Sequence, residues 1–357
     1  MGTVLRRIFS DGGDNLRDKV IALLILLIVA NIGVWCWAFM AFRDHPLLMG
    51  TAFLAYSFGL RHAVDADHIA AIDNVTRKLM QEGKRPIGVG FFFSLGHSSI
   101  VVLASVGVAA TAAAFKDQIE AFHAIGGLIG TAVSASFLLA IAVINLMILV
   151  GVYRTFRHVK AGGRYVDEDL DMLLARGGLL ARLFRPVFGL IRRSWHMYPL
   201  GFLFGLGFDT ATEVGLLGIS AVQGSQGLPI WSILVFPALF TAGMSLVDTI
   251  NSILMLGAYG WAFVKPIRKL FYNMTITAVS VIVAVVIGGI EALGLLSDKF
   301  NLTGPVWDLV GSLNDSLGTV GYLIIGIFVV SWIVSAVIYR VKRYDEIDAR
   351  LTTDTPR

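Results

Sequence analysis

The feature that most constrains this chain is a series of long apolar stretches. A helix that spans a lipid bilayer needs roughly 20 predominantly apolar residues. Eight stretches meet this length, at residues 20–42, 46–72, 87–115, 125–153, 197–222, 230–264, 271–296 and 320–339. Only 15% of the 357 residues are charged, whereas soluble globular chains carry about 25%. We therefore predict an all-α, polytopic membrane protein with eight transmembrane helices.

Positive charges are distributed unevenly between the connections. One side of the predicted membrane has 25 of the 29 Lys and Arg residues and the other side has three, while Arg61 falls inside a span. Loops rich in Lys and Arg stay in the cytoplasm, so we expect both termini to be cytoplasmic and no nucleic-acid partner. The predicted segments are an N-terminal tail, helices one to four, a cytoplasmic linker, helices five to eight and a C-terminal tail, at residues 1–19, 20–153, 154–196, 197–340 and 341–357.

Polar side chains are concentrated in four of the eight predicted spans. An ionisable group at the centre of a membrane helix costs at least ~2.5–3.5 kcal/mol, so that such groups mark sites for ions or substrates. The candidates are Arg61, His62, Asp65, Asp67 and His68 in span two, His97 in span three, Asp209, Thr212 and Glu213 in span five, and Met244, Asp248 and Asn251 in span six.

The second span carries a pattern typical of a transition-metal site. On a continuous helix, His62, Asp65 and His68 fall within an arc of about 120°. Imidazole and carboxylate groups suit first-row divalent ions. Asp67 falls outside this arc, so that either it orients an imidazole on a neighbouring helix or the helix is broken here. Gly59 precedes the polar run and is compatible with a break.

Other polar residues have simpler interpretations. We expect Arg61 to be a counter-ion for one of the acidic groups in the spans. His97 fits either a metal ligand or a hydrogen-bonded contact between helices, and Met244 fits either a gap-filling core residue or a thioether ligand. Asp73 and Arg77 follow the second span and are expected to form a surface pair.

Two short matches relate the halves of the chain. Residues 93–98 (Phe-Ser-Leu-Gly-His-Ser) match residues 240–245 (Phe-Thr-Ala-Gly-Met-Ser) at an offset of 147, and residues 58–60 match residues 204–206 at an offset of 146. A shift of three spans reverses the orientation in the membrane. We therefore predict an inverted repeat of helices 2-3(-4) and 5-6(-7), with the site between the two copies.

Four motifs together resemble those of the nickel/cobalt transporter family. Residues 61–69 read Arg-His-Ala-Val-Asp-Ala-Asp-His-Ile, similar to the H-x-x-x-x-D-H signature of that family. The others are Leu-Gly-His-Ser-Ser at 95–99, Leu-Gly-Phe-Asp-Thr-Ala-Thr-Glu at 206–213 and Gly-Met-Ser-Leu-Val-Asp at 243–248. The resemblance covers all eight predicted spans, in order.

The resemblance implies a single-subunit secondary permease that brings Ni²⁺ or Co²⁺ into a bacterial cell through the cytoplasmic membrane. It implies selection of the metal by His62, Asp65, Asp67 and His68, with His97 close by. We expect no enzymatic activity, no resident cofactor and no ATPase subunit.

Two alternatives stay open. Related efflux permeases share the span-two motif but usually carry a long His-rich loop, whereas the longest loop here contains only His158, with His196 at its edge. The second alternative is an intramembrane metallopeptidase, whose H-E-x-x-H signature is absent from this sequence.

Overall fold

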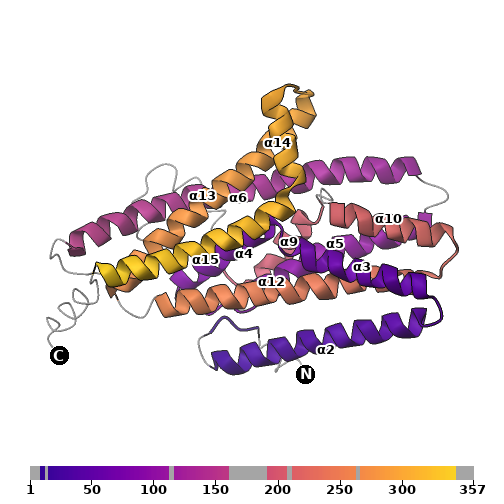
Figure 1. Ribbon diagram of the computed structural model, residues 1–357, viewed down its shortest axis with the longest axis horizontal. Coiled ribbons are helices and arrows are strands. Elements are labelled where there is room, and N and C mark those ends of the chain that lie inside the picture. Colours follow the sequence, from indigo (N-terminus) through magenta and orange to yellow (C-terminus); the bar gives the residue numbers. More distant parts are fainter. Residues whose placement is uncertain are drawn as a thin grey trace.

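The computed structural model describes residues 9–12, 15–111, 116–160, 191–206, 211–262 and 266–342. Within these residues every regular element is a helix, so that the expected all-α class is confirmed. In Figure 1 the long helices run along a common axis, drawn horizontally, and α14 (Pro305–Asp315) projects to one side.

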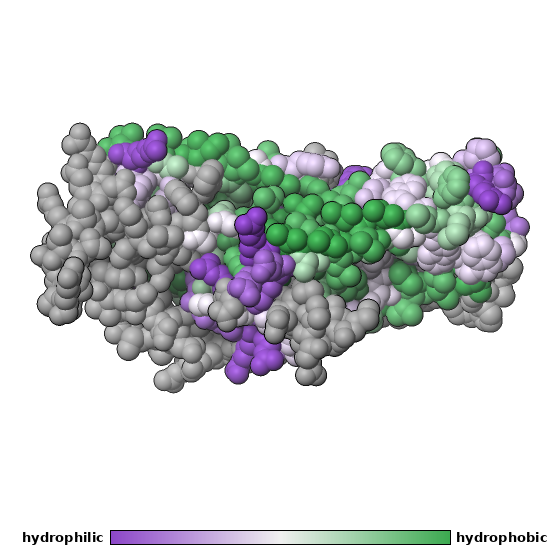
Figure 2. Space-filling model, turned by 90° about the horizontal axis from the view of Figure 1, so that it is seen from below, coloured by the Kyte–Doolittle hydropathy of each residue, from purple (hydrophilic) through white to green (hydrophobic). Residues whose placement is uncertain are grey.

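Six helical stretches of the described chain are long and apolar enough to cross a membrane. They are Leu16–Phe42, Val89–Ala109, Leu128–His158, Ile230–Gly260, Met274–Phe300 and Val320–Val341. The helices concerned are α2 (Leu16–Phe42), α5 (Val89–Thr111), α6 (Lys116–Lys160), α11 (Ile230–Ile233) with α12 (Val235–Ala262), α13 (Pro266–Phe300) and α15 (Leu317–Val341). Large apolar side chains such as Val29 and Leu323 are more than half exposed, and Figure 2 shows an extended hydrophobic area on one face. A surface of this kind is typical of a multi-pass membrane protein.

The other two predicted spans are each divided into two helices. The four helices are α3 (Pro46–His62), α4 (Ala66–Gln81), α9 (Met197–Phe204) and α10 (Ala211–Ser225). Asp65 precedes α4 in an extended conformation, with φ −63° and ψ 147°, as is usual for the residue that precedes a helix. Of the two alternatives left open for residues 46–72, the structure therefore has the broken helix.

The divided segments pack against two central helices, α5 and α12. Helices α3 and α4 contact α12, whereas α9 and α10 contact α5. Glycines allow the closest approaches: a Cβ atom at Gly59 of α3 would clash with the carbonyl oxygen of Phe240 in α12, and one at Gly205, beyond α9, would lie 2.8 Å from the carbonyl oxygen of His97 in α5. Tight backbone contact thus holds both divided segments against the helices that carry the polar residues.

The remaining helices surround this centre. Helix α6 packs against α13, α13 packs against α15, and α2 packs against α12. Helix α15 also reaches the break in the second span, because a Cβ atom at Gly321 would clash with the carbonyl oxygen of Val64. The last described helix therefore supports the segment that separates α3 from α4.

Candidate metal centre

Three histidines lie together at the break between α3 and α4. His62 is the last residue of α3, His68 lies in the first turn of α4, and His97 faces them from α5. One ring nitrogen of each lies within 4.8 Å of the others, and the three residues are at most 3% exposed. We call these residues the three-histidine group. Imidazoles this close can bind one divalent transition-metal ion.

Two of the rings are oriented by a carboxylate at Nδ1. Asp65 Oδ2 lies 2.7 Å from His62 Nδ1, and Asp248 Oδ2, on α12, lies 3.3 Å from His68 Nδ1. A carboxylate at one ring nitrogen fixes the ring and makes the other nitrogen a better ligand. Nε2 of His68 has no hydrogen-bond partner in the part of the chain that the structure describes, and it is therefore the ring atom available to an ion.

The third ring connects the group to α10. His97 Nε2 lies 2.8 Å from Glu213 Oε1 and 2.9 Å from His62 Nε2. Thr212 Oγ1 lies 3.4 Å from His62 Nδ1, and both α10 residues are buried. The site thus combines imidazole nitrogens with a neighbouring carboxylate, which are the donor types that suit first-row divalent ions.

Aromatic side chains flank the three-histidine group. The ring of Phe93 lies 4.8 Å from that of His68, and the ring of Phe240 lies 5.5 Å from that of His62, measured between centroids. Both phenylalanines are fully buried. Apolar walls of this kind restrict water around the polar atoms, which strengthens their interaction with an ion.

The structure corrects the single-helix interpretation of His62, Asp65 and His68. The two histidines meet because the chain turns between α3 and α4, and Asp65 contacts a ring instead of sharing a helical face with it. Asp67 is partly buried and is not a member of the three-histidine group. Arg61 is exposed and has no ion pair with any described residue, and one of its possible partners, Asp209, lies outside the described part of the chain, so that the counter-ion role stays a prediction.

Three other residues were expected to support the site. Met244 is fully buried in an apolar cluster, as the gap-filling interpretation predicts. Asn251 lines a cavity between α12, α13 and α15. Asp209 falls in residues 207–210, which lie outside the described part of the chain.

A second buried polar network, which sequence reasoning missed, lies further along α4. Asp73 and Arg77 were expected at the surface but are at most 1% exposed, and no ion pair joins them. Asp73 accepts a hydrogen bond from the hydroxyl of Tyr259 in α12 and another, 2.6 Å long, from Ser280 in α13. Arg77 Nη2 donates to Asn74 Oδ1 at 2.8 Å. The surface prediction is wrong because α12 and α13 cover α4 beyond residue 72, where the predicted span ends. The sequence did contain a signal for this burial, because Tyr259 and Ser280 are polar residues inside predicted spans six and seven.

A helical membrane protein with buried histidines and carboxylates at a broken helix belongs to the class with an intramembrane ion site. The family model NicO, described as High-affinity nickel-transport protein, matches residues 48–338. The chain belongs to this family, which is a family of transporters and not of enzymes.

Similar proteins cover nearly the whole chain. The High-affinity nickel transport protein of Cupriavidus necator is 64% identical over 94% of this chain and 95% of its own length. The Nickel transporter NixA of Staphylococcus aureus is 47% identical over 91% and 94%. The Cobalt transport protein NhlF of Rhodococcus rhodochrous is 38% identical over 88% and 89%. No solved structure matches the chain.

Proposed function

We propose that the chain is a secondary transporter that takes up Ni²⁺ or Co²⁺ across the bacterial cytoplasmic membrane. The observation that carries this proposal is the buried three-histidine group at a break within a membrane segment. Interrupted helices near the middle of the bilayer are where transporters bind ions, and the similar proteins are named for nickel and cobalt. The ion is the substrate, and the mechanism requires neither a resident cofactor nor an ATPase subunit.

The nitrogen positions support binding of such an ion. His62 Nε2 and His97 Nε2 are 2.9 Å apart. Two imidazole nitrogens bound at right angles, each with a metal–nitrogen distance of about 2.1 Å, would be about 3.0 Å apart. One ion could therefore take both nitrogens with little movement of the rings, and His68 Nε2 is the third candidate ligand. Right-angled arrangements of this kind are typical of Ni²⁺.

The proposed topology places eight crossings in the membrane, with the two divided segments as crossings two and five. It places the N-terminal tail, the loop after α4 and residues 154–196 on the cytoplasmic side. Contacts between these segments support the arrangement: Arg85 N donates to Asp11 O at 2.8 Å, Ser194 N donates to Asp11 Oδ2 at 3.0 Å, and Lys84 Nζ donates to Arg192 O at 2.7 Å. Three connections with the same expected side thus touch one another.

The proposed inverted repeat relates α3, α4 and α5 to α9, α10 and α12. Glycine contacts support it, because the α3–α12 and α5–α9 pairs use equivalent positions. Added Cβ atoms would meet carbonyl oxygens in four pairs: Gly59 with Phe240, Gly201 with Phe93, Gly243 with Tyr56 and Gly96 with Tyr198. In these pairs, equivalent residues of α3 and α9 are 142 positions apart in the chain, and equivalent residues of α5 and α12 are 147 positions apart. The contacts of α5 and α12 therefore agree with the offset of 147 found in the sequence. The sequence offset of 146 for residues 58–60 differs from the contact offset of 142 by four residues, about one helical turn. Rocking of one copy against the other would expose the site to each side in turn.

Uptake of ⁶³Ni²⁺ by cells that express single variants tests the proposal. We expect His62→Ala and His68→Ala to abolish high-affinity uptake. His45→Ala is the matched control, because His45 is exposed and lies before α3, and it should transport normally. Wild-type uptake by either site variant, at equal protein level in the membrane, would contradict the ligand assignment.

The same cells separate the alternatives. An exporter would lower the cellular ⁶³Ni²⁺ content when expressed, whereas the proposed permease raises it. Competition by unlabelled Co²⁺ at sub-micromolar concentration ranks the two ions. A metallopeptidase would cleave a single-span substrate protein and leave the metal content unchanged.

A further inference from the structure

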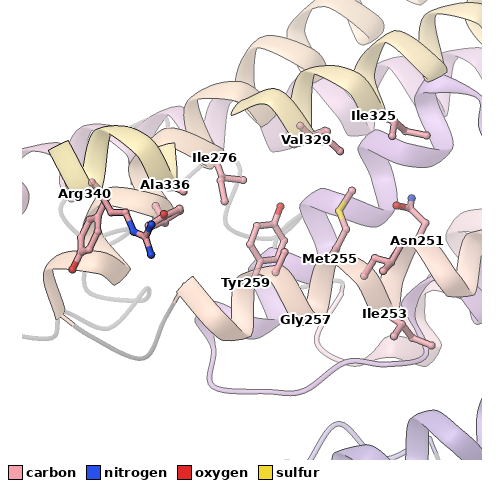
Figure 3. A pocket seen from close by; sticks show the side chains of 15 residues that line it. Asn251, Ile253, Met255, Gly257, Tyr259, Ile276, Ile325, Val329, Ala336 and Arg340 are labelled. Carbon is pink, nitrogen blue, oxygen red and sulfur yellow. The ribbon is translucent and has the colours of Figure 1, made fainter. Parts of the chain in front are cut away.

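A large cavity lies between α12, α13 and α15, and none of the three histidines lines it. Its volume is about 950 Å³, at the upper end of the ~300–1,000 Å³ usual for small-molecule sites. Figure 3 shows Arg340 at one end and Asn251 at the other, with Met255 and Tyr259 projecting into the space between them. The cavity is therefore elongated along the helices.

The chemistry of the lining suits a long apolar ligand with an anionic end. Apolar side chains line most of the cavity, among them Leu254, Met255, Ile276, Ile325, Phe328, Val329 and Ala336. Among the described lining residues Arg340 is the single charged one, and it is exposed. A hydrated cation would find few oxygen or nitrogen ligands here, so that the cavity is unsuited to the transported ion.

We propose that this cavity binds an anionic phospholipid, with acyl chains between α12, α13 and α15 and the phosphate on Arg340. Leu254 and Val329 are 66% and 51% exposed, so the cavity opens toward the apolar surface from which a lipid would enter. A guanidinium group can hold a phosphate through two hydrogen bonds, and basic pockets between membrane helices on the cytoplasmic side bind anionic headgroups. Assignment to the cytoplasmic leaflet rests on the proposed topology, whereas binding itself does not.

The residues that follow α15 do not suit the cavity. Residues 343–357 read Arg-Tyr-Asp-Glu-Ile-Asp-Ala-Arg-Leu-Thr-Thr-Asp-Thr-Pro-Arg, in which no two apolar residues are adjacent. Such a segment would have to bury charged groups against an apolar wall. A second copy of the chain, seated through its own α15, is the rival occupant that the experiment must distinguish.

The cavity also lies next to the second polar network. Tyr259 lines the cavity, and its hydroxyl donates to Asp73 of α4. Helix α4 begins beside the metal centre with His68 in its first turn. A bound lipid would therefore pack against Tyr259 of α12 and help to maintain its hydrogen bond to Asp73, which holds α4 in place.

The test uses the full-length chain purified in detergent, with its unfolding temperature followed by size-exclusion chromatography after heating. Phosphatidylglycerol and phosphatidylcholine with identical acyl chains are titrated separately. We expect phosphatidylglycerol to raise the unfolding temperature at a lower concentration. Arg340→Gln should raise its half-saturating concentration about fivefold, the effect of one basic residue near an anionic headgroup, and should leave the response to phosphatidylcholine unchanged.

Two further variants locate the effect. Lys299→Gln is the matched control, since Lys299 is exposed and does not line the cavity, and it should respond as wild type. Gly257→Leu adds a side chain where a Cβ atom has no neighbour within 4 Å, so that it fills the cavity without backbone strain and should remove the response to both lipids.

Three outcomes would overturn the lipid proposal. Equal responses to both lipids, unchanged in Arg340→Gln, would exclude the headgroup assignment. A full response in Gly257→Leu would exclude the cavity, and a dimer that forms on removal of lipid and is lost in Gly257→Leu would identify a second copy as the occupant. Normal lipid responses in a protein that fails to transport ⁶³Ni²⁺ would reject the proposed function and leave the lipid site intact.

Discussion

Substitution of Gly205 by alanine gives a quantitative test of the contact between α9 and α5. The added Cβ atom would lie 2.8 Å from the carbonyl oxygen of His97, whereas ordinary van der Waals contact begins at about 3.4 Å. The two segments must therefore separate by about 0.6 Å. Overpacking of this kind typically costs ~1–3 kcal/mol of stability. Gly205 has φ −62° and ψ −14°, a conformation that alanine adopts freely. The cost of the substitution therefore comes from the contact and not from backbone strain.

The separation also reaches the candidate metal centre. His97 Nε2 and Glu213 Oε1 are 2.8 Å apart, and a displacement of His97 would lengthen this contact, to about 3.4 Å at most, and weaken it. We expect Gly205→Ala to lower both the unfolding temperature and the affinity for Ni²⁺ in uptake.

Gly218→Ala is the matched control for this test. Gly218 lies within α10, and a Cβ atom there has no neighbour within 4 Å. Alanine should stabilise the helix by ~0.5–1 kcal/mol and leave transport unchanged. If Gly205→Ala unfolds and transports like wild type, or if both variants lose stability equally, the close approach of Gly205 to His97 is refuted.

Two further predictions follow from single contacts. Asp248→Asn keeps an oxygen near His68 Nδ1 but removes the charge. We expect the Ni²⁺ concentration for half-maximal uptake to rise about 10–100-fold, which is the usual effect of losing the residue that hydrogen-bonds to a metal ligand. An unchanged concentration would show that Asp248 does not orient the His68 ring. Burial lowers the pKa of Lys78 from 10.5 to about 8, opposed in part by Glu82. Between pH 8 and 10.5 the unfolded chain binds more protons at Lys78 than the folded chain, so the contribution of this residue to stability should rise with pH. The unfolding temperature should therefore increase less between pH 8 and 10 in Lys78→Met than in the wild type. Parallel pH profiles of the two proteins would contradict this.

The class of fold and the location of the polar residues could be predicted from the sequence because both depend on local properties. Span length follows from apolar runs, and the cost of burying charge in lipid makes residues such as His68 and Asp248 stand out. Both were expected at one site, but the contact between these two side chains was not predicted.

The geometry of the site could not be predicted in the same way. A continuous helix and a broken one give the same composition for residues 61–69, and the choice depends on partners distant in the chain, such as Gly321 against Val64. Burial of Asp73 likewise depends on Tyr259 and Ser280, which are 186 and 207 residues away. Such long-range contacts leave no periodic signal.

The break between α3 and α4 has a thermodynamic consequence. His62 ends one helix and His68 lies in the first turn of the next, so that an ion bound to both would be a chelate that bridges two helices. Its affinity depends on the angle between them, because a change that parts the imidazoles removes a ligand. By linkage, the ion favours the angle that binds it most tightly. Opening of this junction and release of the ion would then be a single event, with no separate step needed to weaken the site.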